Sequence, residues 1–209
     1  MTQFDAARDQ WLRFRASIRE QLEHTSTERF RIAWTSVDER TQFYMRDLLP
    51  RVADDLKFAS RTELLRVDMA MGVPSANENE MVPLVWIESE NDLTDITHEV
   101  RKLASLSGPL KVLITCCEWD DTPGAWPHGG QKRELEKWTA ILREHCQAWH
   151  SVSVFAVIVG EWNGTNGTLR FYAIAFDAMG NLVDDHSILL GRTVGEPPPR
   201  QFRGQHTEV

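Results

Sequence analysis

An almost unbroken apolar run at Leu110–Cys117 (LKVLITCC) constrains the fold of this chain more than any other segment. Such a strand is typical of a sheet that is covered on both faces, because a strand with one solvated face alternates apolar and polar residues. Helices with one apolar stripe are the usual cover. The run therefore predicts an α/β fold with a central sheet between helical layers.

Four segments have the apolar spacing of amphipathic helices. They are Phe4–Leu22, Ser36–Leu56, Asp92–Leu106 and Gln131–Trp149. Ser36 and Glu39 have the spacing of a capping box, and Pro50 predicts a bend in that second helix. Gly108 and Pro109 predict the end of the third helix.

Five further segments are expected to join the apolar run as strands of a mixed sheet. They are Arg29–Thr35, Glu63–Met71, Val82–Glu90, Ser151–Val159 and Leu169–Phe176. The polar segment 72–80 is expected to be a hairpin loop. An Asn-Gly-Thr-Asn-Gly turn between the last two strands predicts a C-terminal antiparallel hairpin.

Length and composition favour one domain. The chain has 209 residues, of which 42% are hydrophobic and 26% charged, as in an ordinary globular protein. We expect a single α/β domain over residues 1–190. Residues 191–209 contain three consecutive prolines and few residues that could pack, so they are expected to form a mobile tail.

The sequence predicts a cytoplasmic protein with no membrane partner. No apolar run approaches the roughly 20 residues that a membrane span needs, and the amino terminus is charged throughout. Cys116 and Cys117 are adjacent and Cys146 is distant, so neither a disulfide framework nor paired zinc-binding spacing can be formed. We expect buried thiols that act as small hydrophobic groups.

The net charge of −8, from 31 acidic and 23 basic residues, argues against indiscriminate binding to nucleic acid. A local basic cleft stays compatible with this total, because the distribution of charge matters more than its sum. The composition is therefore compatible with a nucleic-acid partner, and it is also compatible with a homo-oligomer.

Three acidic residues stand in special positions on two consecutive strands. Asp68 lies in one strand, and Glu88 and Glu90 close the next, where period-two alternation points both to one face. Adjacent strands lie about 4.8 Å apart, so Asp68 and Glu88 can approach one divalent cation. Magnesium commonly takes one or two protein carboxylates and completes its shell with water and substrate phosphate.

The segment from Arg61 to Glu118 resembles the core of the PD-(D/E)XK nuclease-like superfamily. The matching features are Asp68 in LLRVDMAMG, the Glu88–Glu90 triplet in VWIESEN, and the helix-to-strand segment HEVRKLASLSGPLKVLITCC. The resemblance implies a restriction-endonuclease-like core at about residues 36–118. The order is helix, strand with Asp, strand with Glu, helix and apolar strand.

The same resemblance implies roles for five residues. Asp68 and Glu88 would hold Mg²⁺ or Mn²⁺, and the Ser89 backbone carbonyl could add a ligand. Glu90 stands where the family usually has a lysine, so the chain carries a Glu-x-Glu variant. Lys102, on the following helix, is a candidate for a lysine that has moved from the strand.

Simpler interpretations compete with this site. The carboxylates can form an exposed acidic face, and Lys102 can be a solvated charge. We expect His98 on a polar helix face, His128 in a turn and His145 partly buried on a helix. The mixture of Lys132, Arg133, Lys137 and Arg143 with glutamates predicts a salt-bridged surface rather than a phosphate track.

Two functions therefore follow from the sequence. The first is a metal-dependent phosphodiesterase that acts on DNA or RNA, with Glu90 as a further ligand or a group that positions water, and Lys102 stabilising charge in the transition state. The second is a non-catalytic nuclease-fold binding or assembly module. An unrelated α/β protein with an acidic surface is a third hypothesis.

Overall fold

A seven-stranded mixed sheet forms the centre of the chain. The computed structural model describes residues 2–76, 80–91, 96–122, 125, 129–163 and 166–195, apart from the side chains of 185–187. Within them, sheet neighbours follow sequence order. The strands are β1 (Ala59–Leu64), β2 (Val67–Pro74), β3 (Met81–Glu90), β4 (Leu110–Cys116), β5 (Val154–Asn163), β6 (Thr168–Asp177) and β7 (Leu182–Thr193).

The three central strands are parallel and the outer ones antiparallel. β3 pairs with β4 and β4 with β5 in parallel, whereas β1–β2, β2–β3, β5–β6 and β6–β7 are antiparallel. The predicted single-domain α/β class, with a mixed sheet between helices and a hairpin near the C-terminus, is confirmed.

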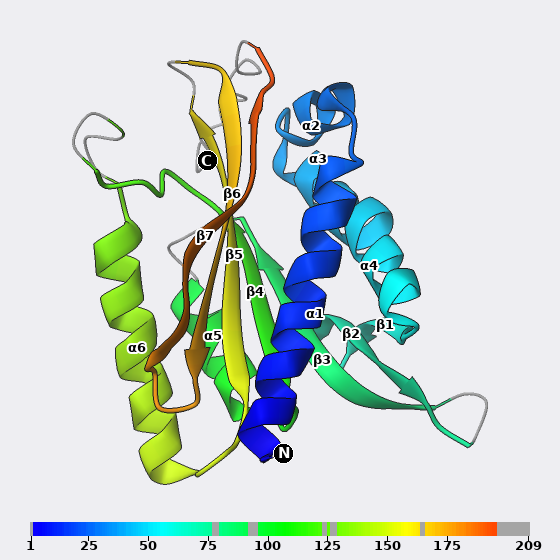
Figure 1. Ribbon diagram of the computed structural model, residues 1–209, viewed down its shortest axis with the longest axis vertical. Helices are drawn as coiled ribbons and strands as arrows, with labels where there is room; N and C mark the ends of the chain where they lie inside the picture. The colour runs from blue at the N-terminus through cyan, green and yellow to red at the C-terminus, as the bar shows by residue number, and fades with distance from the viewer. Residues whose placement is uncertain are drawn as a thin grey trace, which may run out of the picture.

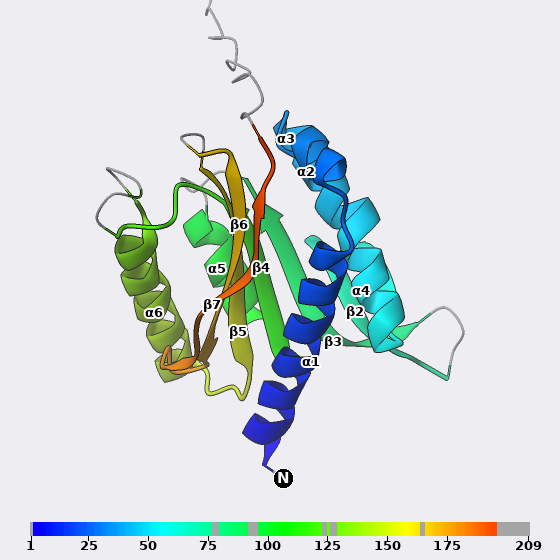
Figure 2. The ribbon, with the colours of Figure 1, turned by 45° about the horizontal axis from the view of Figure 1, so that its top comes forward.

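Helices cover both faces of the sheet (Figures 1 and 2). One face packs on α1 (Gln3–Glu23), α2 (Thr27–Ala33), the π-helical segment η1 (Phe43–Leu48) and α4 (Leu49–Leu56). The short helix α3 (Val37–Gln42) connects α2 to η1 and has no buried residue. The other packs on α5 (Ile96–Ser105) and α6 (Gln131–Ala148). β4 contributes Val112 and Ile114 to the first layer and Leu113 to the second, so it is covered on both sides as predicted.

The strand predicted at Arg29–Thr35 is wrong, because this segment forms helix α2. The Ser26 side chain caps the helix by accepting a hydrogen bond from the Arg29 backbone N–H. Phe30 and Ala33, three residues apart, are buried against the core, whereas Ile32 is exposed. The alternation of Phe30, Ile32 and Trp34 suggested a strand, but the buried residues follow the period of a helix.

The helix predicted to follow Ser36 is formed, with an irregular middle. Ser36 caps α3 by accepting from the Glu39 N–H, and the helical path then continues through η1 into α4. The predicted bend near Pro50 coincides with this wider turn, where the Leu49 N–H donates to the Tyr44 carbonyl five residues back. Proline lacks the N–H of a regular α-helical bond, which favours such local rearrangement.

The strand predicted at Glu63–Met71 is in fact two strands joined by a tight turn at Leu65 and Arg66. Both residues have positive φ angles, 53° and 64°, and Leu65 is exposed. The turn carries no glycine, proline or asparagine, so the usual sequence indicators of a turn were missing. β2 also extends to Pro74, three residues into the predicted loop.

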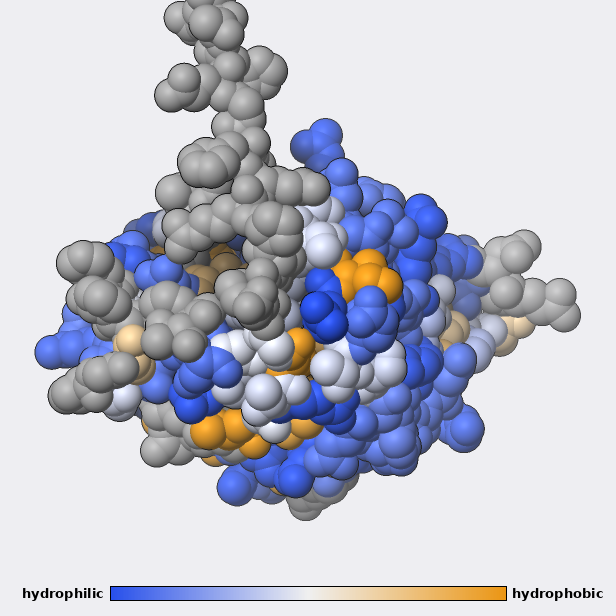
Figure 3. Space-filling view, turned by 90° about the horizontal axis from the view of Figure 1, so that it is seen from above, coloured by the Kyte–Doolittle hydropathy of each residue, from blue (hydrophilic) through white to orange (hydrophobic). Residues whose placement is uncertain are grey.

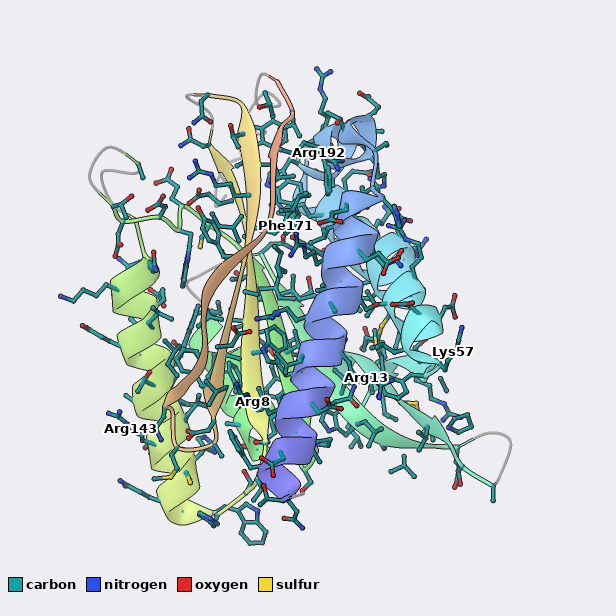
Figure 4. The ribbon with its side chains drawn as sticks, in the orientation of Figure 1. Arg8, Arg13, Lys57, Arg143, Phe171 and Arg192 are labelled. Carbon is teal, nitrogen blue, oxygen red and sulfur yellow. The ribbon has the colours of Figure 1, made fainter. Side chains whose placement is uncertain are left out.

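β7 was not predicted, and its last residues correct the start of the expected tail at 191. The strand continues to Thr193. Arg192 fixes this end against the first helical layer. Its guanidinium lies 5.3 Å from the centre of the Phe30 ring and donates to the carbonyl of Glu23. Figure 4 shows Arg192 and the nearby Phe171 at this end of the sheet.

Phe171→Ala should lower the free energy of unfolding by about 3–5 kcal/mol, because the fully buried ring would leave a cavity. The Phe171 ring lies 5.7 Å from Phe30 and 5.6 Å from Trp34. Ile188→Thr on neighbouring β7, where the side chain is 56% exposed, should change stability by less than about 0.5 kcal/mol. Urea denaturation measures both values, and equal effects would contradict this description of the core.

Candidate functional site

Asp68 and the Glu88–Glu90 segment lie on adjacent antiparallel strands. The β2–β3 ladder ends on this side with the pair Met69–Ile87. Beyond it, Asp68 Oδ2 accepts a hydrogen bond of 2.8 Å from the Ser89 backbone N–H. The carboxylate thus takes the place of a backbone acceptor where the two strands separate. This contact fixes Asp68 beside the end of β3.

Glu88 is buried and faces Lys102 of α5. Glu88 is only 3% exposed, and its Oε1 atom lies 2.6 Å from Lys102 Nζ. The same ammonium lies 2.5 Å from Glu99 Oε2 and donates to the Arg66 carbonyl oxygen at 3.1 Å. One lysine therefore joins β3, its own helix and the turn between β1 and β2.

The packing of α5 explains how Lys102 reaches this position. Ile96, Val100 and Leu103 form the buried stripe of the helix against the sheet. Glu99 and Lys102 are three residues apart and therefore neighbours on the helix surface. Because the stripe holds α5 alongside the sheet, these two side chains come to the ends of β2 and β3.

The environment changes the pKa values of both partners. Burial, together with the charges of Asp68 and Glu99, raises the pKa of Glu88 to about 8, although Lys102 acts in the opposite direction. Desolvation lowers the pKa of Lys102, but the two glutamates outweigh it and leave that pKa above its usual value. The lysine therefore stays protonated next to an acid that resists ionisation.

The other predicted site residues lie at the end of the same strand. Glu90 is the last residue of β3 and is partly buried. Ser89 contributes its backbone N–H to Asp68, while its buried hydroxyl has no hydrogen-bond partner among the described residues. The proposed use of its carbonyl as a metal ligand stays a prediction.

The cluster offers a hard divalent cation a small ligand set, with two carboxylates. Among the described residues there is no group of three or more His, Cys, Asp or Glu that could hold a metal. Two carboxylates on adjacent strands nevertheless match what Mg²⁺ commonly takes from a protein. Glu88 Oε1 is buried and lies 2.6 Å from the Lys102 ammonium. A cation at this site would therefore share Glu88 with Lys102.

The other residues considered from the sequence are histidines, cysteines and basic residues. His98 is exposed on α5 and His145 is partly buried on α6, while His128 lies outside the described residues. The three cysteines are free and partly buried, and Cys116 and Cys117 pack against the two hydrophobic clusters, in keeping with the expected role as small hydrophobic groups. Arg133 and Lys137 pair with Glu134, in keeping with the expected salt-bridged surface.

Arg66 is the contact that sequence reasoning missed. Its carbonyl can accept from Lys102 because the turn between β1 and β2 brings the backbone there. The predicted continuous strand did not contain this turn. The proximity of Glu99 to Lys102, by contrast, follows from their spacing on the helix.

The cluster belongs to the end of the sheet at which β3, β4 and β5 finish, which is the upper end in Figure 1. Viewed from above, the visible described surface is mainly hydrophilic with small separate hydrophobic areas (Figure 3). The part of this end that is visible and described is therefore mainly polar.

Comparison of the sequence with known protein families found no match, and comparison with curated proteins found no similar sequence. No helix in the described ranges is both long and apolar enough to cross a membrane. The interpretation of the site therefore depends on its own geometry.

Lys102→Met should lower the free energy of unfolding by about 1–3 kcal/mol, because it leaves Glu88 buried beside other acids without its cation. The loss should be smaller at pH 5 than at pH 8, since a protonated Glu88 needs no counter-charge. Adding Glu88→Gln should restore part of the stability. Urea denaturation at both pH values provides the measurement.

Arg101→Ala is the matched control for this experiment. Arg101 precedes Lys102 on α5, but its ion pair with Glu144 is exposed. Such pairs contribute at most about 1 kcal/mol. A loss in Lys102→Met no greater than in this control would show that Lys102 does not support Glu88.

Proposed function

We propose that the chain is a metal-dependent phosphodiesterase that cleaves DNA or RNA. The observation that carries the proposal is the 2.6 Å approach of Lys102 Nζ to the buried Glu88, beside Asp68 on the adjacent strand. Two carboxylates and an amine from three separate elements converge here. The element order α4, β1, β2, β3, α5, β4 contains the order implied by the resemblance to PD-(D/E)XK nucleases.

Each residue has a role that follows from its position. Asp68 and Glu88 would hold Mg²⁺ or Mn²⁺, with Ser89 and Glu90 at the same strand end as further candidate ligands. Such an ion supplies activation of water and stabilisation of phosphate charge. Lys102 would place a positive charge near the scissile phosphate, the role usually given to a lysine at the Glu90 position. Glu99 and the Arg66 carbonyl hold Lys102 in place.

Crowding of acids at this site favours a cation-dependent role. Asp68 and Glu99 both raise the pKa of Glu88, so the carboxylates repel one another when ionised. A simple acidic surface would leave such groups solvated, whereas Glu88 is buried and held in contact with a lysine. Buried ionisable groups with strongly shifted pKa values are frequent at functional sites.

The alternative is a non-catalytic module with the same fold. Glu90 in the usual lysine position and the net charge of −8 favour this alternative. In that case the Glu88–Lys102 pair would be a structural remnant. Metal binding and cleavage separate the two functions.

Mn²⁺ or Mg²⁺ should raise the melting temperature of the wild-type protein, because a ligand that binds only the folded state stabilises it by about 2.7 kcal/mol at a hundred times its Kd. Asp68→Asn should abolish this rise. The asparagine carbonyl can still accept the Ser89 N–H, so the variant should fold. Differential scanning calorimetry with and without metal tests the effect.

Asp55→Asn on the exposed side of α4 removes one equivalent charge and serves as the control. It should respond to metal as the wild type does. If Asp68→Asn also responds like the wild type, the ion binds elsewhere and the assigned ligands are wrong.

Lys102→Ala should reduce Mn²⁺-dependent cleavage of DNA or RNA at least tenfold, about 1.4 kcal/mol in activation free energy. Metal affinity should change little, because the carboxylates remain. Initial rates on single-stranded and double-stranded substrates, measured well below the melting temperature of the variant, test this expectation. Arg101→Ala should cleave like the wild type.

An unchanged rate in Lys102→Ala would reject the role of the lysine and leave the carboxylate site standing. Absence of cleavage by wild-type protein with metal bound, on every substrate tested, would reject the phosphodiesterase. Retained binding of nucleic acid in that case would support the non-catalytic module.

A further inference from the structure

A cavity of about 260 Å³ lies between α5 and α6, away from the candidate active site. The start of β4 contributes Lys111 to its wall, and Ala104 and Leu142 contribute from the two helices. Trp149, just after α6, also lines it and is 75% exposed. In Figure 1 this is the lower end of α6, opposite the end at which β3 and β4 finish. The cavity is therefore open to solvent beside an aromatic side chain.

Lys111 is the unusual group of this cavity. It is only 2% exposed, and its ammonium donates to the Ala104 carbonyl oxygen at 3.2 Å. No carboxylate in the described part of the chain forms an ion pair with it. Buried lysines are rarely left without an anionic partner.

The missing counter-charge has an energetic consequence. Transfer of an ammonium group out of water is costly unless another charge or several hydrogen bonds compensate. Burial alone lowers the pKa of Lys111 to about 8. Among the described residues, the Ala104 carbonyl is the one hydrogen-bond acceptor of this buried amine.

We propose that this cavity binds a small organic anion whose carboxylate or phosphate group contacts Lys111. The walls suit the remainder of such a molecule, because Leu142 and Phe155 are apolar and Trp149 offers an aromatic face at the opening. Ser151 and Ser153 supply polar groups for orientation. The volume is slightly below the usual 300–1,000 Å³ of ligand sites, which favours a compact ligand.

This site is independent of the proposed phosphodiesterase. Lys111 lies near the start of β4, where Leu110 pairs with Val85, whereas Glu90 pairs with Thr115 at the other end. Neither Asp68 nor Glu88 lines the cavity. Failure of nuclease activity would leave the anion site standing, and the reverse also holds.

Isothermal titration calorimetry of the full chain with phosphate, acetate and benzoate tests the proposal. Chloride-matched buffer without metal avoids the other site. At least one of the three anions should bind the wild type, and benzoate should exceed acetate if the apolar wall and Trp149 contribute. Phosphate binding without carboxylate binding would assign the site to phosphate-bearing ligands.

Lys111→Met keeps the length of the side chain and removes its charge, so affinity for the best anion should fall at least tenfold. Lys111→Gln, which retains a donor for the Ala104 carbonyl, provides a second variant if the first does not fold. Arg143→Met is the control. Arg143 is an exposed cation on α6 next to Leu142, and Figure 4 shows it on that helix. This variant should bind like the wild type.

No binding of any of the three anions to the wild type would overturn the proposal. So would equal affinities of the wild type and the folded Lys111 variants, because the anion would then contact another group. An equal loss in Arg143→Met would indicate general surface electrostatics and would overturn it too.

Discussion

Burial of β4 on both faces is the constraint on which the rest of the structure depends. Its Val112 and Ile114 require the layer built by α1, η1 and α4, and its Leu113 requires the layer of α5 and α6. Neither layer alone can remove the strand from water. The parallel neighbours β3 and β5 are fixed by the same requirement, since their connections must cross through α5 and α6. The candidate site lies where this packing places the end of β3 next to α5.

Because both faces of the sheet are covered, charged groups between the sheet and α5 or α6 are buried and need partners. Glu161 accepts from the backbone N–H groups of Trp119 and Asp120, and Tyr172 also donates to it. Glu134 is held by Arg133 and Lys137.

Glu88 is similarly matched by Lys102, whereas Lys111 finds one neutral carbonyl, that of Ala104, among the described residues. The requirement that a buried charge has a partner is therefore met at one end of the sheet and not at the other. At one end the protein supplies the counter-charge. At the other a bound anion is the group that would complete the pattern.

The sequence predicted an element well where its apolar residues recur with the period of a helix or a strand. β4, α6 and β6 were predicted within one residue of their observed bounds, whereas β5 begins three residues and ends four residues later than predicted. Long apolar stripes and the hairpin turn indicated these elements. The prediction failed at α2, where a helical period was taken for strand alternation, and at the β1–β2 turn, which has none of the usual turn residues. The residues at Leu65 and Arg66 adopt positive φ angles without a glycine, which no local pattern indicated.

Part of the candidate site could be predicted for the same reason. The adjacency of Asp68 and Glu88 follows from two consecutive strands with a short connection. The approach of Lys102 needed the exact path of α5, because a helix can carry a side chain beside a strand end or away from it. Residues 92–95, which begin the predicted helix, lie outside the described part of the chain. Spacing alone could therefore not determine this contact.

Because Lys102 lies on helix α5 and not on β3, its position depends on the packing of that helix. A lysine on β3 would be fixed by the strand that carries Glu88. Lys102 is fixed instead by the packing of Val100 and Leu103 and by contacts with Glu99 and the Arg66 carbonyl. A small shift of α5 would thus move the positive charge while leaving both carboxylates in place. The geometry of the charged cluster is therefore coupled to the second helical layer, the same layer that β4 needs for its own burial.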